Sequence, residues 1–251
     1  MAAVKPGAWP SATCWSNERR TGAKSVMTVT LNGSTYSGRV SVLQRVDLGE
    51  VEYEVATKDM KSWVEERTDG TAGDRLFLLS HPQVITYGSR TSPADLPAET
   101  AGIPAVAVDR GGFATYHGPG QLVGYLVIDL KQRGAVDVVR WVENGLITAL
   151  GELGFPLVRR ETPRGESSLV GVWTEDHRKL CSIGMRIRRG VTSHGFSINV
   201  DPAMDVFHTF TTCGLHDVTM VSLAELAAEQ GRPVPTDAEV RDAVAAALGA
   251  V

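Results

Sequence analysis

The chain has 251 residues, with 25 lysines and arginines against 29 aspartates and glutamates, and a formal net charge of -4. A chain of this length folds without disulfides or a metal, its acidic balance disfavours general nucleic-acid binding, and its apolar stretches are too short to span a membrane. Three cysteines, Cys14, Cys181 and Cys213, cannot build a disulfide framework and favour a reducing compartment.

The first 26 residues differ in character from the rest. They are basic, lack apolar periodicity and contain helix-breaking prolines. We expect a disordered extension at 1–26, followed by a single catalytic domain at 27–251 of a cytoplasmic protein. The alternative is an organelle transit peptide, because the segment is basic and poor in acids, which would imply a mitochondrial or plastid protein.

Hydrophobic periodicity beyond this segment alternates between the strand and helix patterns. In chain order it predicts a strand at 39–46, a helix at 50–66, strands at 76–79 and 84–87, a loop at 91–104, strands at 106–109 and 122–130, a helix at 136–153, strands at 169–174, 179–187 and 192–200, and helices at 221–230 and 237–248. Thr236 and Glu239 form a predicted capping box for the last helix. The pattern is that of a mixed α/β domain.

Five glycines gather in the run RGGFATYHGPGQLVG at 110–124. Glycine allows tight turns and a close approach of the backbone to another group. Arg110, His117 and Gln121 lie between these glycines, and polar groups of this kind orient ligands. The run therefore predicts a substrate pocket, although a glycine-rich hairpin without a ligand remains the alternative.

Two cysteines are candidate nucleophiles. Cys213 precedes a glycine outside any periodic segment, so a turn can present it to solvent, or it is an inert loop residue. Strand alternation places Cys181 on the same face as Lys179, although a buried small side chain is the simpler interpretation. Lys179 begins an apolar strand, either as a solvated strand end or as an ammonium that stabilises a thiolate.

The six histidines show no metal-ligand spacing, since HExxH, HxH and CxxC are absent. His117 and His194 are candidate pocket residues, or hydrogen-bonded core histidines. We expect neither a metal nor another cofactor.

Several ordered blocks resemble the lipoyl(octanoyl) transferases. The run RGGFATYHGPGQLVGY at 110–125 is the most specific, followed by KLCSIGMRIRRGVTSHGFSIN at 179–199. TCGL at 212–215 and His81-Pro82 with 86–90 match further family motifs. The resemblance covers about residues 40–230 and implies an α+β fold like that of the biotin and lipoate ligases, with a mixed sheet flanked by helices.

The resemblance also implies an activity. Such enzymes transfer an octanoyl group from acyl carrier protein to a lysine of lipoyl domains through a cysteine thioester, the first step of protein lipoylation. Cys213 matches the acyl-accepting nucleophile, and Lys179 matches the lysine that activates it and serves as acid and base. The implied substrate-binding residues are Arg110, Gly111, Gly112, Phe113, Ala114, Thr115, Tyr116, His117, Ser182, Ile183, Gly184, Gly195, Phe196 and Ser197.

The same resemblance implies protein partners and shows where this sequence departs from the family motifs. It implies acyl carrier protein bearing octanoyl-phosphopantetheine as donor, and as acceptors the lipoyl domains of 2-oxoacid dehydrogenase complexes and the glycine cleavage H protein. Thr212 replaces the usual proline before the cysteine, and Cys181, Leu126 and Ser197 also depart from common family residues. None of these changes removes the thiol or the lysine.

A basic stretch occupies 159–189, where eight arginines and lysines face four acidic residues within a chain of net charge -4. Such a surface steers acidic carrier proteins, or it is simply a solvated hairpin. Two rival functions remain open. One is an ATP-dependent lipoate or biotin ligase, which needs no cysteine, and the other is a non-catalytic module that binds carrier proteins.

Overall fold

The computed structural model describes residues 26–31, 34–39, 42–97, 102–130, 134–215 and 218–251, and the chain divides into a unit at 1–40 and a unit at 41–251. In the first unit, strands β1 (Val26–Leu31) and β2 (Ser34–Arg39) form an antiparallel hairpin. The extension predicted at 1–26 lies almost entirely outside the described residues. It stays a prediction, as does a domain beginning at residue 27.

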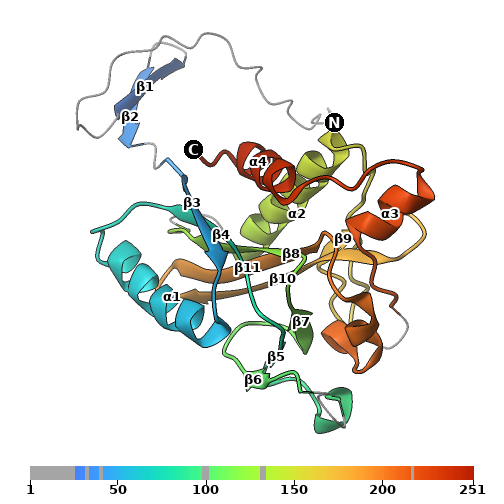
Figure 1. The fold of residues 1–251 in the computed structure, drawn as a ribbon. Helices are drawn as coiled ribbons and strands as arrows, with labels where there is room; N and C mark the ends of the chain where they lie inside the picture. Colours follow the sequence, from blue (N-terminus) through green and yellow to red (C-terminus); the bar gives the residue numbers. More distant parts are fainter. Residues whose placement is uncertain (1–25, 32–33, 40–41, 98–101, 131–133, 216–217) are drawn as a thin grey trace, which may run out of the picture. The chain divides into compact units, whose positions relative to one another are not determined.

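The second unit contains a six-stranded mixed sheet and a three-stranded sheet (Figure 1). In spatial order, the larger sheet consists of β3 (Gln44–Glu50), β4 (Arg75–Ser80), β8 (Gln121–Val127), β11 (Val191–Asn199), β10 (Lys179–Arg188) and β9 (Gly171–Trp173). Only β3 and β4 are parallel within it. The smaller sheet consists of β6 (Ala105–Ala107), β5 (Val84–Tyr87) and β7 (Thr115–His117).

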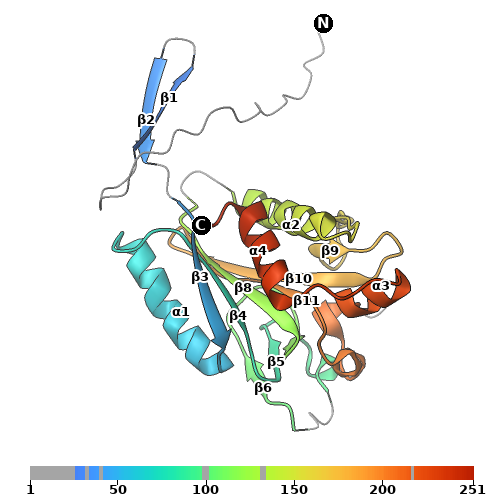
Figure 2. The same cartoon turned by 45° about the horizontal axis from the view of Figure 1, so that its top comes forward.

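Helices cover both faces of the larger sheet, as Figure 2 shows for α1 (Tyr53–Thr68) on one side and α2 (Ala135–Glu152) with α4 (Asp237–Leu248) on the other. Strand alternation makes this possible, because successive side chains of β4 point to opposite faces. Leu76 and Leu78 join the core beneath α2 and α4, whereas Phe77 and Leu79 join the core beneath α1. A short helix, α3 (Leu223–Glu229), completes the unit.

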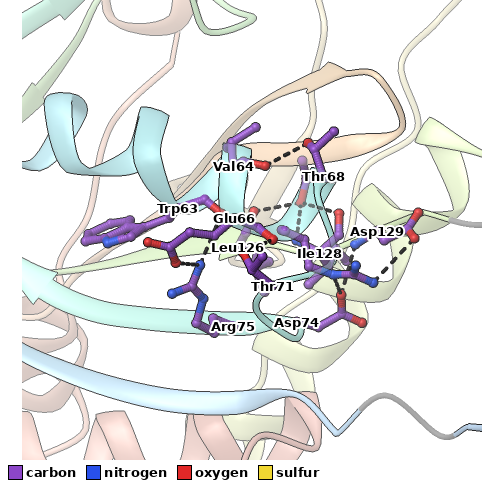
Figure 3. A network of polar contacts seen from close by, with 12 residues as sticks. Trp63, Val64, Glu66, Thr68, Thr71, Asp74, Arg75, Leu126, Ile128 and Asp129 are labelled. Atoms are coloured by element: carbon purple, nitrogen blue, oxygen red, sulfur yellow. Dashed lines mark hydrogen bonds and ion pairs between the residues drawn. The ribbon is translucent and has the colours of Figure 1, made fainter.

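A polar network fixes the C-terminal end of α1 to the sheet (Figure 3). The Arg67 guanidinium contacts the Asp74 carboxylate at 2.6 Å and the Asp129 carboxylate at 3.3 Å. Arg75, at the start of β4, donates to the Trp63 carbonyl at 3.1 Å. Because Arg67 and Asp74 are largely buried, these charge-assisted bonds position α1 more firmly than an exposed ion pair would.

Most of the predicted elements are confirmed with their ends shifted by a few residues. The Thr236–Glu239 capping box is present, with the Thr236 side chain accepting from the Glu239 amide. The chain reverses between β10 and β11 at Arg189, with φ 52°, and Gly190, with φ 78°. Strand β7 was not predicted, because its three residues lie inside the glycine-rich run and are too few to show a period. The predicted mixed sheet flanked by helices is confirmed.

Candidate functional site

A cavity of about 210 Å³ lies against the larger sheet on the side that α1 covers. Tyr53 from α1 and Val123 and Tyr125 from β8 contribute to its wall, and all three belong to or adjoin that face of the core. Of the implied catalytic and substrate-binding residues, all but Ala114 and Tyr116 line this cavity. Segments more than 100 residues apart in the sequence therefore meet in one space. Gln121, which was expected to orient a ligand, does not line it and donates instead to the Asn199 side chain at 2.8 Å.

Alternation along β7 explains the two exceptions. Thr115 and His117 line the cavity, whereas Tyr116 points into the opposite core and meets the Phe207 ring edge-on with centroids 5.5 Å apart. Ala114 is fully buried, and its carbonyl oxygen accepts a hydrogen bond instead. The resemblance implied every residue of this segment, but successive residues of a strand face opposite sides, so only some of them reach the cavity.

Cys213 lies in a short 3-10 helix, Thr212–Gly214, with a left-handed backbone at φ 59° and ψ 14°. Its amide donates to the Ala114 carbonyl at 2.8 Å, which ties the turn to the glycine-rich run. Gly214 follows at φ 65°, and a Cβ there would lie 2.7 Å from the Phe113 ring. The local sequence thus holds the thiol, half-buried, at the cavity wall.

A β-bulge decides which side chains of β10 reach the cavity. Lys179 pairs with Trp173 and Cys181 with Val172, so that Leu180 is the extra residue. Lys179 and Ser182 both line the cavity, whereas Leu180 and Cys181 are fully buried in the core beneath α2.

The expectation that regular alternation brings Cys181 to the face of Lys179 is therefore wrong. The bulge breaks the alternation that the prediction assumed. Burial in the core also raises the pKa of the Cys181 thiol well above its usual value. Cys181 thus behaves as a small core side chain, and Cys213 is the cysteine that lines the cavity.

Lys179 is only 2% exposed, and its Nζ lies 5.0 Å from the centroid of the Trp173 ring. No carboxylate of the described residues forms an ion pair with it. Gly171, with φ 143°, makes room for its side chain, because a Cβ there would lie 2.7 Å from Lys179 Cε. The site therefore holds a largely desolvated lysine whose charge interacts with an aromatic face rather than with an acid.

Arg110 anchors the glycine-rich loop. Its guanidinium donates to the Thr86 carbonyl at 2.9 Å and to the Thr86 hydroxyl at 2.8 Å. The Gly111 amide donates to the Met185 carbonyl at 3.3 Å, which joins the loop to β10. Burial lowers the pKa of Arg110, although the group stays cationic at neutral pH because arginine begins from so high a value.

Beside the cavity lies a buried network of tyrosines and histidines. His81 Nδ1 is 2.6 Å from the Val51 carbonyl, so it carries a proton, and Nε2 of the neutral ring accepts from the Tyr125 hydroxyl at 2.7 Å. Burial lowers the pKa of His81 and raises that of Tyr53 to about 12. The Tyr53 ring stacks on the His117 ring at 6.1 Å. All of these rings are uncharged at neutral pH.

His117 and His194 both line the cavity and are both buried. Burial holds the pKa of His117 well below its ordinary value, and burial with the nearby Arg110 lowers that of His194 to about 4. His194 Nε2 lies 3.3 Å from the Asp109 carboxylate, which also pairs with Arg186. This contact links β11 to the start of the glycine-rich loop.

Sequence reasoning missed Tyr53, Tyr125 and Arg90 as cavity residues. Tyr125 ends the block 110–125 and lies two residues after Val123, which also lines the cavity, so strand alternation could have predicted it. Arg90, whose guanidinium lies 4.9 Å from the Phe113 ring centroid, belongs to the block that follows His81-Pro82. Tyr53 offered no signal, because only the packing of α1 brings it to the cavity.

The basic stretch at 159–189 is partly neutralised within the fold. Arg178 binds Glu229 through both terminal nitrogens, at 2.6 and 2.9 Å, and Arg186 pairs with Asp109. Arg159 pairs with Glu161 at 2.8 Å. The free positive charge of this region is therefore smaller than the count of its residues implies.

The described ranges contain no helix that is both long and apolar enough to cross a membrane. The same ranges hold no group of three or more histidine, cysteine, aspartate or glutamate side chains placed to hold a metal ion.

The sequence matches the model of the lipoyl protein ligase A/B catalytic domain over residues 52–249. The octanoyltransferase of Frankia casuarinae is 45% identical over 193 residues, which span 76% of this chain and 87% of the relative. The octanoyltransferase of Nocardia farcinica is 44% identical over 208 residues, spanning 80% of this chain and 78% of the relative.

Solved structures with the same fold include lipoate ligases. A lipoate-protein ligase A bound with ATP aligns with a TM-score of 0.59 at 14% identity, covering 82% of this chain and 83% of that one. The bipartite lipoate protein ligase of Thermoplasma acidophilum aligns with a TM-score of 0.57 at 15% identity, covering 82% of each chain. At these identities the likeness concerns the fold alone.

Proposed function

The chain belongs to the lipoyl protein ligase A/B catalytic family, and from this we propose that it is an octanoyltransferase that works through a Cys213 thioester. The donor is octanoyl-phosphopantetheine on an acyl carrier protein, and the acceptor is a lysine of a lipoyl domain. The observation that carries the proposal is the shared cavity of Cys213 and Lys179, two residues 34 positions apart that no sequence periodicity connects.

In the first half-reaction, the Cys213 thiolate attacks the thioester carbonyl of the donor. The bond between the carbonyl carbon and the pantetheine sulfur breaks, and the Lys179 ammonium gives its proton to the departing thiolate. The products are octanoyl-Cys213, a free pantetheine thiol and a neutral Lys179. The half-buried thiol at the cavity wall and the desolvated lysine suit these roles.

In the second half-reaction, the neutral amine of an acceptor lysine attacks the octanoyl-Cys213 carbonyl. Lys179 takes the proton that the amine loses, the carbon–sulfur bond breaks, and the Cys213 thiolate returns. Charge and protons balance over the cycle, because Lys179 ends as the ammonium with which it began. Conversion of a thioester to an amide runs downhill, so the cycle consumes no ATP.

An ATP-dependent ligase is the main rival, since structures of this fold include one bound with ATP. A ligase activates its acid as an adenylate and does not use a cysteine. In this chain, a cysteine with a left-handed backbone and a buried lysine line the same cavity, which favours acyl transfer. Exchange between ATP and pyrophosphate in the presence of free octanoate would reveal the ligase instead.

Intact mass after incubation with octanoyl-carrier protein tests the proposal. We expect an octanoyl adduct on wild type and on Cys181→Ala, which removes only a core thiol, and none on Cys213→Ala. Lys179→Met should slow adduct formation while leaving Cys213 open to alkylation. An adduct on Cys181 would refute the proposed mechanism, and carrier-protein binding without any adduct would indicate a binding module.

The proposed partners are acidic carrier proteins and lipoyl domains. Arg164, Arg188 and Arg189 are exposed and form no ion pair with a described residue, so they remain available to an acidic surface. Reversing two of these charges should slow the reaction with octanoyl-carrier protein more than the reaction with a small octanoyl thioester.

A further inference from the structure

Ser182 lies next to the proposed nucleophile. Its Oγ is 3.6 Å from the Cys213 Sγ, within the range of a hydrogen bond to sulfur. The serine is partly buried and lines the same cavity. The described residues give its hydroxyl no side-chain partner other than this sulfur. A polar hydrogen is thus placed beside the atom that would attack the substrate.

The backbone holds Ser182 rigidly. In β10 it pairs with Ser197 on β11 and with Gly171 on β9, so strands support it on both sides. The bulge at Leu180 brings Ser182 to the cavity together with Lys179, three residues before it. The hydroxyl is therefore preorganised, which is the condition for strong stabilisation of a developing charge.

Two backbone amides of the segments that line the cavity, those of Cys213 and Gly111, are already engaged. The Cys213 amide donates to the Ala114 carbonyl at 2.8 Å, and the Gly111 amide donates to the Met185 carbonyl. A tetrahedral intermediate on Cys213 would carry its oxyanion on the carbon bonded to Sγ, close to a hydroxyl that lies 3.6 Å from that sulfur. Ser182 places a hydroxyl donor at this point.

We propose that the Ser182 hydroxyl is an oxyanion donor, a catalytic role beyond substrate contact that rests on Cys213 being the nucleophile. Before the attack the hydroxyl hydrogen-bonds with the sulfur. As the carbon–sulfur bond forms, the negative charge moves from sulfur to the carbonyl oxygen, and the hydroxyl turns to donate to that oxygen. When the intermediate collapses, the carbonyl double bond returns and the pantetheine sulfur leaves. Ser182 keeps its own proton throughout.

The test compares two reactions of the same thiol. Acylation by octanoyl-carrier protein passes through an oxyanion, whereas alkylation by iodoacetamide forms none. In Ser182→Ala we expect single-turnover acylation, followed by intact mass, to slow by about 10²- to 10³-fold. At each pH, the rate of alkylation should stay within about twofold of the wild-type rate, since this reaction develops no charge on oxygen.

Two further variants complete the design. Ser182→Thr keeps the hydroxyl and should acylate within about tenfold of wild type. Ser193→Ala removes a serine of β11 that does not line this cavity, and should acylate normally. Acylation of Ser182→Ala at the wild-type rate would overturn the proposal. The proposal would also be overturned if the alkylation pH profile of Ser182→Ala shifted far enough to account for its loss of acylation, because the hydroxyl would then act only on the thiolate. If wild type forms no octanoyl adduct, it is the proposed function that fails, which is a separate result.

Discussion

Replacing Gly171 by alanine tests the idea that this glycine exists to admit the Lys179 side chain. Gly171 has φ 143°, a backbone conformation that side chains rarely adopt. A Cβ at this position would overlap the Cys181 carbonyl oxygen and lie 2.7 Å from Lys179 Cε. The carbonyl belongs to a paired strand and cannot yield, so the flexible lysine must move away.

The size of the effect follows from two costs. The backbone conformation costs about 1–3 kcal/mol, and overpacking against β10 costs about 1–3 kcal/mol more. The free energy of unfolding should therefore fall by about 2–6 kcal/mol, which lowers Tm by roughly 5–20 °C for a domain of this size. Displacement of Lys179 should also reduce octanoyl transfer by about 10²-fold, the contribution of a positioned acid and base.

Thermal melts and single-turnover acylation measure the two effects. Gly70→Ala is the matched control, since Gly70 has φ 73° but nothing within 4 Å of its would-be Cβ. It should lose about 1–2 kcal/mol from backbone strain alone and keep the wild-type transfer rate. If Gly171→Ala transfers the octanoyl group as fast as wild type, Gly171 does not act by admitting Lys179.

Three other changes probe the rest of the fold. Burial lowers the pKa of His194 from 6.5 to about 4 on folding, so the unfolded chain binds more protons than the folded chain between these values. The free energy of unfolding should therefore decline as pH drops from 6.5 towards 4. The urea unfolding midpoint should fall less across this window in His194→Gln than in wild type. Arg67→Ala should lower the free energy of unfolding by about 1.5–3 kcal/mol because it removes charge-assisted bonds to the largely buried Asp74 and the partly exposed Asp129. Arg45→Ala, which breaks exposed ion pairs, should lose about 0–1 kcal/mol. Tyr125→Phe removes the donor to His81 Nε2 and should cost about 1–3 kcal/mol; a melt unchanged from wild type would show that the acceptor finds another partner.

Local patterns predicted the helices and the glycine-rich run because their causes are local. The capping box of α4 needs only Thr236 and Glu239, and the chain reversal between β10 and β11 needs only a short turn. These features require no knowledge of the tertiary structure. Specific motif blocks then located most of the cavity residues, although which faces they present depends on the strand pairing.

Features created by the pairing of distant segments could not be predicted in this way. The bulge in β10 arises from its register with β9, so the sequence of β10 alone placed Cys181 on the wrong face. Tyr53 reaches the cavity only because α1 packs across the sheet. The contact between Ser182 and Cys213 joins residues 31 positions apart through a turn whose conformation no local rule specifies.

The left-handed backbone of Cys213 has a consequence for how this position changes over generations. A non-glycine residue held at φ 59° costs about 1–3 kcal/mol, and glycine or asparagine adopts such a conformation far more readily than cysteine. Folding alone therefore favours glycine or asparagine over cysteine at residue 213. A chain that did not need the thiol would gain folding stability from either replacement. Under the proposed mechanism, the cysteine at residue 213 is therefore kept for its chemistry at a cost to the stability of the scaffold.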